Sequence, residues 1–449
     1  MLKSSNKFGI IAIASTAVII LLIFLLALVG FFLRQPDSTE TTTAESSQTV
    51  LQQIPIDPAL AVTQLGGIAP EDVIDLAIEK SRPGTALATI ISTPSLAPKQ
   101  TAGTLLLLGE KFSRQNDTAR AALSYELAGA IATLSPDLSD TLRADIFLQA
   151  GSGLAALSDA VHAKIYLDQA YIVATESNYL QPAYRQSVLE QLNQIYLKID
   201  DPESARKSLN ASLSPPDLAG KSEAQLELPA IEPIPLSEAV QTAEKTRWQA
   251  AQKVAKNLVE TGGEVQPENL SALRDALLAE DAAKTAFFAD ALAAEKQLSG
   301  KVNIIHSQIE WQSLKYRVAR GGFGISLVPE WETNAEQIRS DLTASYESLF
   351  RQYSDIIVAI PDASQIDRAT EELLRRQLLA GKLGWYPNYP AETLKEQLLA
   401  ASARLIETQP DTKLRVGFLK IDDTEFCTFV SDSDILNQPG GSVQPTATP

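Results

Sequence analysis

The longest apolar stretch of the chain runs from Phe8 to Leu33, 26 residues without a charged side chain. At the helical rise per residue this stretch is about 39 Å long, more than the roughly 30 Å hydrocarbon core of a bilayer. A backbone in lipid must satisfy its own hydrogen bonds, so the stretch is expected to be a helix. A cleaved signal peptide would have a shorter apolar region and a small-residue cleavage site. The pattern therefore favours residues 1–34 as a leader followed by an uncleaved transmembrane helix.

Charged residues on either side of this stretch indicate its orientation. Lys3 and Lys7 precede it, whereas Arg34 after it is soon followed by Asp37 and Glu40. Positive residues favour the cytoplasmic side of a membrane. We therefore expect a single-pass protein of the cell membrane, with a cytoplasmic N-terminus and the bulk of the chain outside the cytoplasm.

Three polar segments divide the rest of the chain. Residues 35–53, rich in Ser, Thr and Gln, are typical of a flexible stalk, residues 217–235 of a Pro-rich linker and residues 433–449 of a disordered tail. The intervening segments are the predicted domains: helical repeats at 54–216, a long helical bundle at 236–320 and a helical C-terminal region at 321–432.

Apolar positions within the first of these domains recur at a spacing of 42 residues, and each unit is predicted to be a helix, a short turn and a second helix. The clearest recurring positions are Asp117, Asp159 and Asp201; Ala121, Ala163 and Ala205; and Tyr125, Leu167 and Leu209. The aspartates fall where each second helix begins, so we expect them to be N-caps. The alanines permit close helix contact, and the larger residues fill the space between units. Three such units predict a stacked α-solenoid.

These units resemble the tetratricopeptide repeat family, whose pattern places large, small and aromatic residues at fixed positions. The first unit carries Leu105, Leu108, Gly109, Phe112, Ala121, Tyr125 and Ala128 at those positions. The resemblance covers about residues 102–217, although the period of 42 is longer than the usual 34 or so. It implies helix pairs stacked in register, with the first helices forming the floor of a concave surface.

The remaining pattern predicts a mainly α fold. Between residues 236 and 320, long Ala-rich helices separated by glycines predict a helical hairpin or a three-helix bundle. In the C-terminal region, Lys413–Ile421 and Glu425–Ser431 alternate in polarity and predict a small β-hairpin in otherwise helical surroundings.

Composition narrows the possible partners and chemistry. The net charge of -17 argues against nucleic acid, which is bound by clustered Lys and Arg. The single cysteine, Cys427, excludes an internal disulfide. Of the two histidines, His162 falls on a predicted second helix with no acidic partner at ligand spacing, and His306 stands alone on a predicted helix. A metal site needs three or four ligands. We therefore predict no catalytic residues, no cofactor and no metal.

Two sets of residues are candidates for contact with a partner. Polar residues on the predicted first helices face the expected groove: Gln149, Gln191 and Gln194. An aromatic, Pro-stiffened segment carries Trp385, Tyr386 and Tyr389, which form either a contact loop or a plug over a core.

The anchor, the stalk and the solenoid together predict a membrane-tethered, extracytoplasmic scaffold that binds a protein or peptide. A structural envelope protein that self-associates into a homo-oligomer is the alternative, favoured by the long Ala-rich helices. An enzyme whose site uses carboxylates such as Glu330, Glu332 and Asp362 is the least favoured interpretation, because carboxylates are abundant throughout this acidic chain.

Overall fold

The computed structural model describes residues 55–135, 137–214 and 230–360, individual positions between 369 and 383, and the backbone of the strands at 415–421 and 424–430. These residues belong to one unit of the chain, Val50–Pro449. Within it the structure is mainly helical, as the sequence predicts.

Several predicted segments lie outside the described residues. They are the anchor Phe8–Leu33, the stalk 35–53, most of the linker 217–235 and the tail 433–449. In the parts of the chain that the structure describes, no helix combines the length and apolar character needed to cross a bilayer.

The described residues begin with three short helices, α3 (Pro58–Leu65), α4 (Pro70–Glu79) and α5 (Pro83–Ile91). Each begins with a proline, whose fixed φ suits the first helical position and whose missing N–H would have no partner there. The α4 and α5 helices form a hairpin that leads into the repeats, whereas α3 packs on the later helix α12 (Glu238–Thr261). The first helix of the described residues therefore contacts the bundle.

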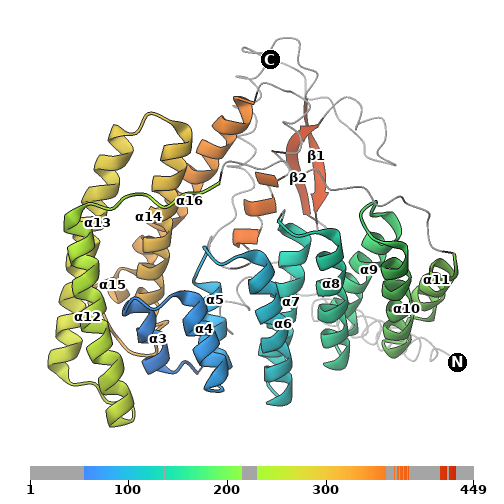
Figure 1. Ribbon diagram of the computed structural model, residues 1–449, viewed down its shortest axis with the longest axis horizontal. Helices are drawn as coiled ribbons and strands as arrows, with labels where there is room; N and C mark the ends of the chain where they lie inside the picture. The colour runs from blue at the N-terminus through green and yellow to red at the C-terminus, as the bar shows by residue number, and fades with distance from the viewer. Residues whose placement is uncertain are drawn as a thin grey trace, which may run out of the picture. The chain divides into compact units, whose positions relative to one another are not determined.

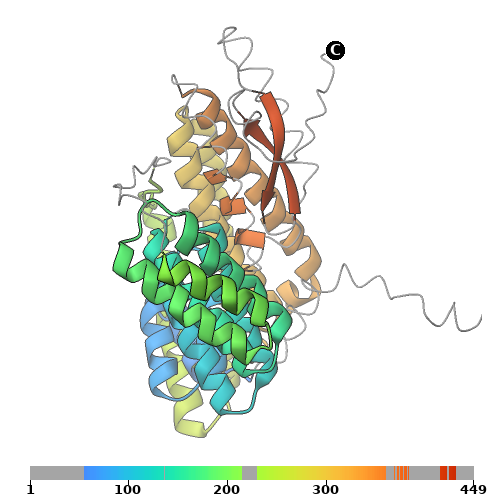
Figure 2. The same ribbon diagram turned by 90° about the vertical axis from the view of Figure 1, so that its right-hand side faces the viewer.

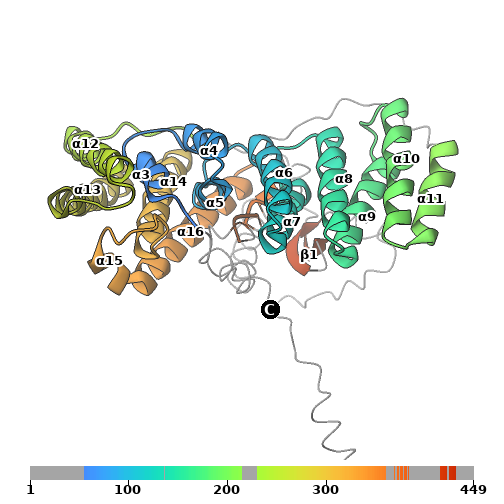
Figure 3. The same cartoon turned by 90° about the horizontal axis from the view of Figure 1, so that it is seen from below.

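The repeats form three helical hairpins in succession. They are α6 (Pro98–Arg114) with α7 (Thr118–Leu134), α8 (Asp140–Ala156) with α9 (Ala160–Glu176), and α10 (Pro182–Lys198) with α11 (Pro202–Leu213). The first helices α6, α8 and α10 contact one another, as do the second helices α7 and α9. The first helices thus make one layer and the second helices another (Figure 3). This arrangement is the solenoid-like stacking expected from the 42-residue spacing.

The predicted N-caps of the second helices are confirmed. Asp117, Asp159 and Asp201 each accept a hydrogen bond from the backbone N–H three residues later, at 3.2, 3.1 and 3.0 Å. These bonds satisfy one of the free N–H groups at each helix start. The residue before each cap turns the chain with a positive φ: Asn116 (58°), Ser158 (64°) and Asp200 (59°).

Tyr125 shows how the units stack. It lies on α7 and is almost fully buried between two glycines, Gly109 on α6 and Gly153 on α8. A Cβ added at Gly109 would lie 2.6 Å from the ring, and one added at Gly153 would also meet it. Because the ring has a glycine on both sides, it cannot move away from one without approaching the other. The glycines therefore set the spacing between the first two units.

We expect Gly153→Ala to destabilise the repeats by about 1–3 kcal/mol, the usual cost of overpacking a dense core. This loss should outweigh the gain of about 1 kcal/mol in helix propensity. Gly103 on α6 is the matched control, because a Cβ there meets nothing within 4 Å. Gly103→Ala should be neutral or stabilising. Urea unfolding followed by circular dichroism would measure both variants, and equal effects would contradict the role given to Gly153.

Arginines join the units at a second recurring position. Arg185 on α10 donates to the backbone carbonyls of Ala174 and, at 2.6 Å, Ser177, at the end of α9. Arg143, 42 residues earlier, donates in the same way to the carbonyls of Ala132 and Ser135 at the end of α7. Each guanidinium satisfies carbonyls that have no partner within their own helix. The first helix of one unit thereby caps the second helix of the unit before it.

The bundle follows residues 230–237 and contains α12, α13 (Pro267–Ala294), α14 (Leu298–Ala319), α15 (Pro329–Thr333) and α16 (Ala335–Val358). The α12 helix packs along α13, and α14 packs along α16 (Figure 1). Two buried apolar clusters result. One contains α3, α12, α13 and α15 with one face of α14, and the other runs from the repeats into the opposite face of α14 and into α16.

Two strands close the described part of the chain. Strand β1 (Arg415–Ile421) pairs antiparallel with β2 (Thr424–Val430), with Arg415 opposite Val430 and Ile421 opposite Thr424. Figure 2 shows the pair as two crossing arrows.

Candidate functional site

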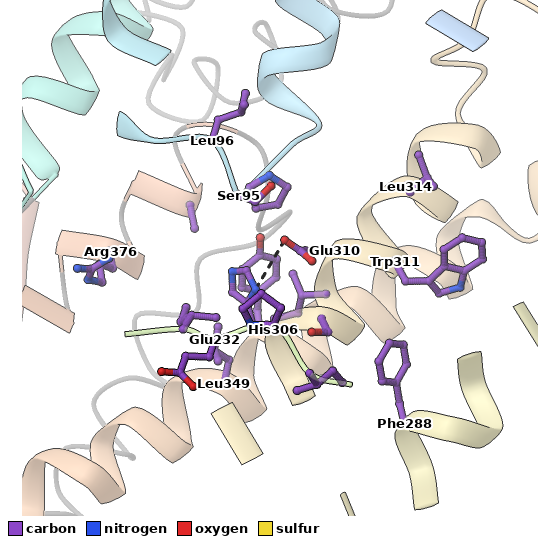
Figure 4. A pocket seen from close by; sticks show the side chains of 18 of the residues that line it. Ser95, Leu96, Glu232, Phe288, His306, Glu310, Trp311, Leu314, Leu349 and Arg376 are labelled. Carbon is purple, nitrogen blue, oxygen red and sulfur yellow. Dashed lines mark ion pairs between the residues drawn. The ribbon is translucent and has the colours of Figure 1, made fainter. Parts of the chain in front are cut away.

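One feature of the described residues with the shape of a ligand site is a cavity of about 740 Å³. It is bounded by α12, α13, α14 and α16, by the α5–α6 connection and by the extended segment 230–236 (Figure 4). The site therefore draws on elements from both sides of the linker. No single stretch of sequence contains it.

The walls of the cavity are rich in aromatic and aliphatic side chains. They include Phe288, Trp311, Leu314, Tyr346, Phe350 and Tyr353. The rings belong to ordinary amphipathic helices: Tyr346, Phe350 and Tyr353 recur at helical spacing on α16, and Trp311 lies on α14. Trp311 is held from outside the cavity by an edge-on contact with Trp331 of α15 and by its N–H, which donates to Asp281 at 2.9 Å.

Two titratable groups of α14 point into this volume. His306 and Glu310 lie one helical turn apart, with 3.8 Å between Nδ1 and Oε1 (Figure 4). The prediction that His306 stands alone on its helix is therefore wrong, because residues i and i+4 share a helix face. Burial lowers the pKa of His306 and raises the pKa of Glu310, the latter offset by Lys284 and by a hydrogen bond from Ser95. Both shifts favour the uncharged forms.

The Glu310 side chain keeps 43% of its surface accessible, although burial dominates the shift in its pKa. The accessible surface of the carboxylate faces the cavity. Protein atoms around the cavity reduce the hydration of the carboxylate without covering it, which explains the raised pKa of an accessible group. Glu310 is thus placed to contact a molecule that enters.

A buried ionic network forms one side of the cavity. Arg247 Nε donates to Glu280 Oε2 at 2.6 Å, and Lys284 Nζ lies 3.0 Å from Glu280 Oε1 and 2.8 Å from Glu244 Oε1. Lys284 also lies 4.5 Å from the centroid of the Trp311 ring. Arg247 and Lys284 already have carboxylate partners, so the network forms part of the cavity wall and offers no unpaired cation to a ligand.

The opposite side is closed by Arg376. Its guanidinium lies 2.8 Å from Glu372 and 3.1 Å from Asp137, which follows α7. This ion pair joins the end of the first repeat to the C-terminal region. The positive charge of Arg376 is therefore neutralised by these two carboxylates.

The extended segment 230–236 covers part of the cavity. Ile231, Ile234 and Leu236 line it, and the N–H of Glu232 donates to Asn303 Oδ1 of α14 at 3.1 Å. The sequence predicts these residues as the end of a Pro-rich linker. Their alternation of apolar residues with proline was the available signal that this part packs against a core.

The predicted partner residues of the repeats lie on the first helices and are exposed. Gln149 is on α8, and Gln191 and Gln194 are on α10. They do not line the cavity. The predicted contact loop, with Trp385, Tyr386 and Tyr389, lies outside the described residues.

His162 has acidic neighbours that the sequence prediction missed. Its Nδ1 lies 2.7 Å from Asp159 Oδ2 and 4.0 Å from Glu126 Oε1. One ligand atom from each of the three residues falls within 4.8 Å of the others. Asp159 could have been predicted as a neighbour, because it lies three residues from His162 on the same helix turn. Glu126 could not, because it lies on another helix, α7. Asp159 is also the N-cap of α9, and Arg120 contacts Asp117 at the equivalent position of the first unit. The cluster is therefore explained by helix capping.

Comparison with known proteins identifies no relative of this chain: no protein family, no curated protein and no solved structure matches it.

Proposed function

We propose that this chain is a membrane-tethered, extracytoplasmic scaffold whose repeats bind an extended peptide segment of a protein partner. The observation that carries the proposal is a surface on the first helices, here called the first-helix strip. Its two rows are Leu107, Gln149 and Gln191, and Glu110, Ser152 and Gln194. Each row steps by 42 residues from α6 to α8 to α10, so corresponding side chains lie at the same level of three adjacent helices.

The chemistry of the strip suits a peptide backbone. A glutamine amide both donates and accepts hydrogen bonds, as a peptide group does. Leu107 is 42% exposed and offers an apolar contact in the same row. The strip is rigidly held, because Arg143 and Arg185 join each unit to the one before it. A preorganised surface loses little conformational entropy when it binds.

In this proposal residues 8–33 are the membrane anchor, and the charged residues on either side of them place the repeats outside the cytoplasm. Residues 35–53 would then separate the repeats from the bilayer. The acidic surface expected from a net charge of -17 would keep the repeats away from anionic lipid.

The proposal predicts that peptides selected on the protein bind through the glutamines. A library of random linear peptides would be panned against the full chain in lipid nanodiscs, and the affinity of the selected peptides measured. The double variant Gln149→Ala, Gln191→Ala should lose about tenfold or more in affinity, since each lost hydrogen bond costs on the order of 1 kcal/mol.

Gln337→Ala is the matched control, because Gln337 is exposed on α16 and its amide contacts only Asp341 among the described residues, at 2.8 Å. It should leave the affinity unchanged. Selected peptides whose affinity does not depend on Gln149 and Gln191 would refute binding at the strip.

A structural protein that self-associates is the second candidate, and one observation favours it. Leu209 on α11 is 43% exposed, whereas its repeat equivalent Leu167 is fully buried between units. Among the described residues, none covers the stacking position of the last unit. Light scattering distinguishes the candidates, because an oligomer that grows with concentration supports self-association, and a monomer at all concentrations supports the scaffold.

A further inference from the structure

We propose that the cavity beside α14 and α16 binds an amphiphilic organic amine, whose ammonium group pairs with Glu310 while its apolar body lies along the aromatic wall. This inference concerns a different surface from the first-helix strip and does not depend on the scaffold function.

The dimensions and lining of the cavity fit a small molecule. Its volume of about 740 Å³ falls within the range of roughly 300–1,000 Å³ that is usual for ligand sites. Its lining combines aromatic and aliphatic walls with charged side chains, most of which are paired with one another. Such a site holds a ligand by apolar contact and orients it through the few polar groups that remain available. Figure 4 shows His306 and Glu310 at the centre, with Phe288, Trp311 and Leu314 to one side.

The pairing of charges around the cavity determines the sign of the ligand. The lining cations are already neutralised: Arg247 by Glu280, Lys284 by Glu244 and Glu280, and Arg376 by Asp137 and Glu372. Glu310 is different, because no described lysine or arginine lies within 4 Å of it: its carboxylate accepts a hydrogen bond from Ser95 and lies 3.8 Å from His306, and Lys284 acts on it only from a greater distance. A carboxylate in such surroundings gains most from a positively charged ligand.

The aromatic wall reinforces this preference. A cation within about 6 Å of an aromatic ring face is attracted by the ring quadrupole. Lys284 already makes this contact with Trp311 from the ionic network, 4.5 Å from the ring centroid. Tyr346 and Phe350, which stack with ring centroids 5.9 Å apart, line the same cavity. An anionic ligand would meet Glu310 and Glu244, and each cation among the described lining residues already has a carboxylate partner.

The protonation states are consistent with this assignment. Burial raises the pKa of Glu310 and lowers the pKa of His306, so these surroundings favour the uncharged forms and His306 adds no competing positive charge. An ammonium group beside Glu310 stabilises the ionised carboxylate and lowers its pKa. Binding of the amine should therefore release a proton wherever the carboxyl is protonated beforehand.

The test uses three probes of the same shape, 4-phenylbutylamine, 4-phenylbutanol and 4-phenylbutyrate, with the full chain in zwitterionic lipid nanodiscs. Isothermal titration calorimetry, corrected with empty nanodiscs, should show the amine binding at least tenfold more tightly than the alcohol, and the butyrate binding most weakly. Glu310→Gln should remove the preference for the amine while the alcohol still binds. Glu336→Gln, at an exposed position on α16, should change none of the affinities.

A second variant keeps the test decisive if Glu310→Gln does not fold. Leu314→Trp places a larger side chain in the cavity and should abolish binding of both the amine and the alcohol. No preference for the amine, a preference that survives Glu310→Gln, or amine binding that survives Leu314→Trp would each overturn the proposal.

Discussion

Replacing Glu280 by alanine is expected to destabilise the bundle by about 3–5 kcal/mol, the usual loss when one partner of a buried ion pair is removed. Glu280 is completely buried on α13 and accepts from both Arg247 and Lys284. Without it, Arg247 keeps only the carbonyl of Leu65 as a described hydrogen-bond partner. A guanidinium without a counter-charge in an apolar interior is costly, because its lost hydration is not replaced.

Urea unfolding followed by tryptophan fluorescence measures this effect, because Trp248 and Trp311 lie against the network, with Arg247 5.9 Å and Lys284 4.5 Å from the ring centroids. Glu260→Ala is the matched control. Glu260 pairs with Lys256 on the surface of α12, and both side chains are largely exposed, so its loss should cost less than about 1 kcal/mol. Similar unfolding midpoints for the two variants would show that the buried network is not a major source of stability.

Replacing Arg185 by methionine is expected to destabilise the last two repeats by about 2–4 kcal/mol, since two buried carbonyls lose their donors at once. Arg185 is fully buried and has no described carboxylate within ion-pair distance. Its charge is stabilised by the carbonyl ends of α9, where the helix dipole favours a cation. Burial accordingly lowers the pKa of Arg185, although a guanidinium still keeps its proton at neutral pH.

Hydrogen exchange followed by mass spectrometry resolves this loss by segment, with faster exchange expected in α9, α10 and α11 than in α12 or α13. Arg143→Met should have a smaller effect, because Arg143 is partly accessible and lies 3.7 Å from Asp140. Arg206→Met tests an exposed arginine on α11 and should change little. Uniformly faster exchange throughout the chain would contradict a local capping role for Arg185.

The candidate sites differ in how far they could be predicted. The exposure of Gln149, Gln191 and Gln194 follows from helical periodicity and the repeat spacing, both of which are local properties of the chain. The cavity could not be anticipated in this way, because Ser95, Tyr346 and Arg376 come from segments widely separated in the sequence. His306 combines both cases. Its contact with Glu310 could be predicted from the sequence, because the two residues lie one helical turn apart, whereas its position inside a cavity could not.

The sequence by itself determined the helices and their ends. Asp117, Asp159 and Asp201 cap the second helices through bonds to N–H groups three residues away, which depend only on neighbouring residues. The 42-residue spacing likewise determined that the units stack in register. Only the tertiary structure decided that α3 packs on α12, that Arg143 and Arg185 cap the preceding units, and that segment 230–236 covers a cavity. The physical reason is that these contacts join segments that are distant in the sequence. Many other residues of the chain could have paired with the same carbonyls or covered the same apolar surfaces, and only the packing of the whole fold selects among them.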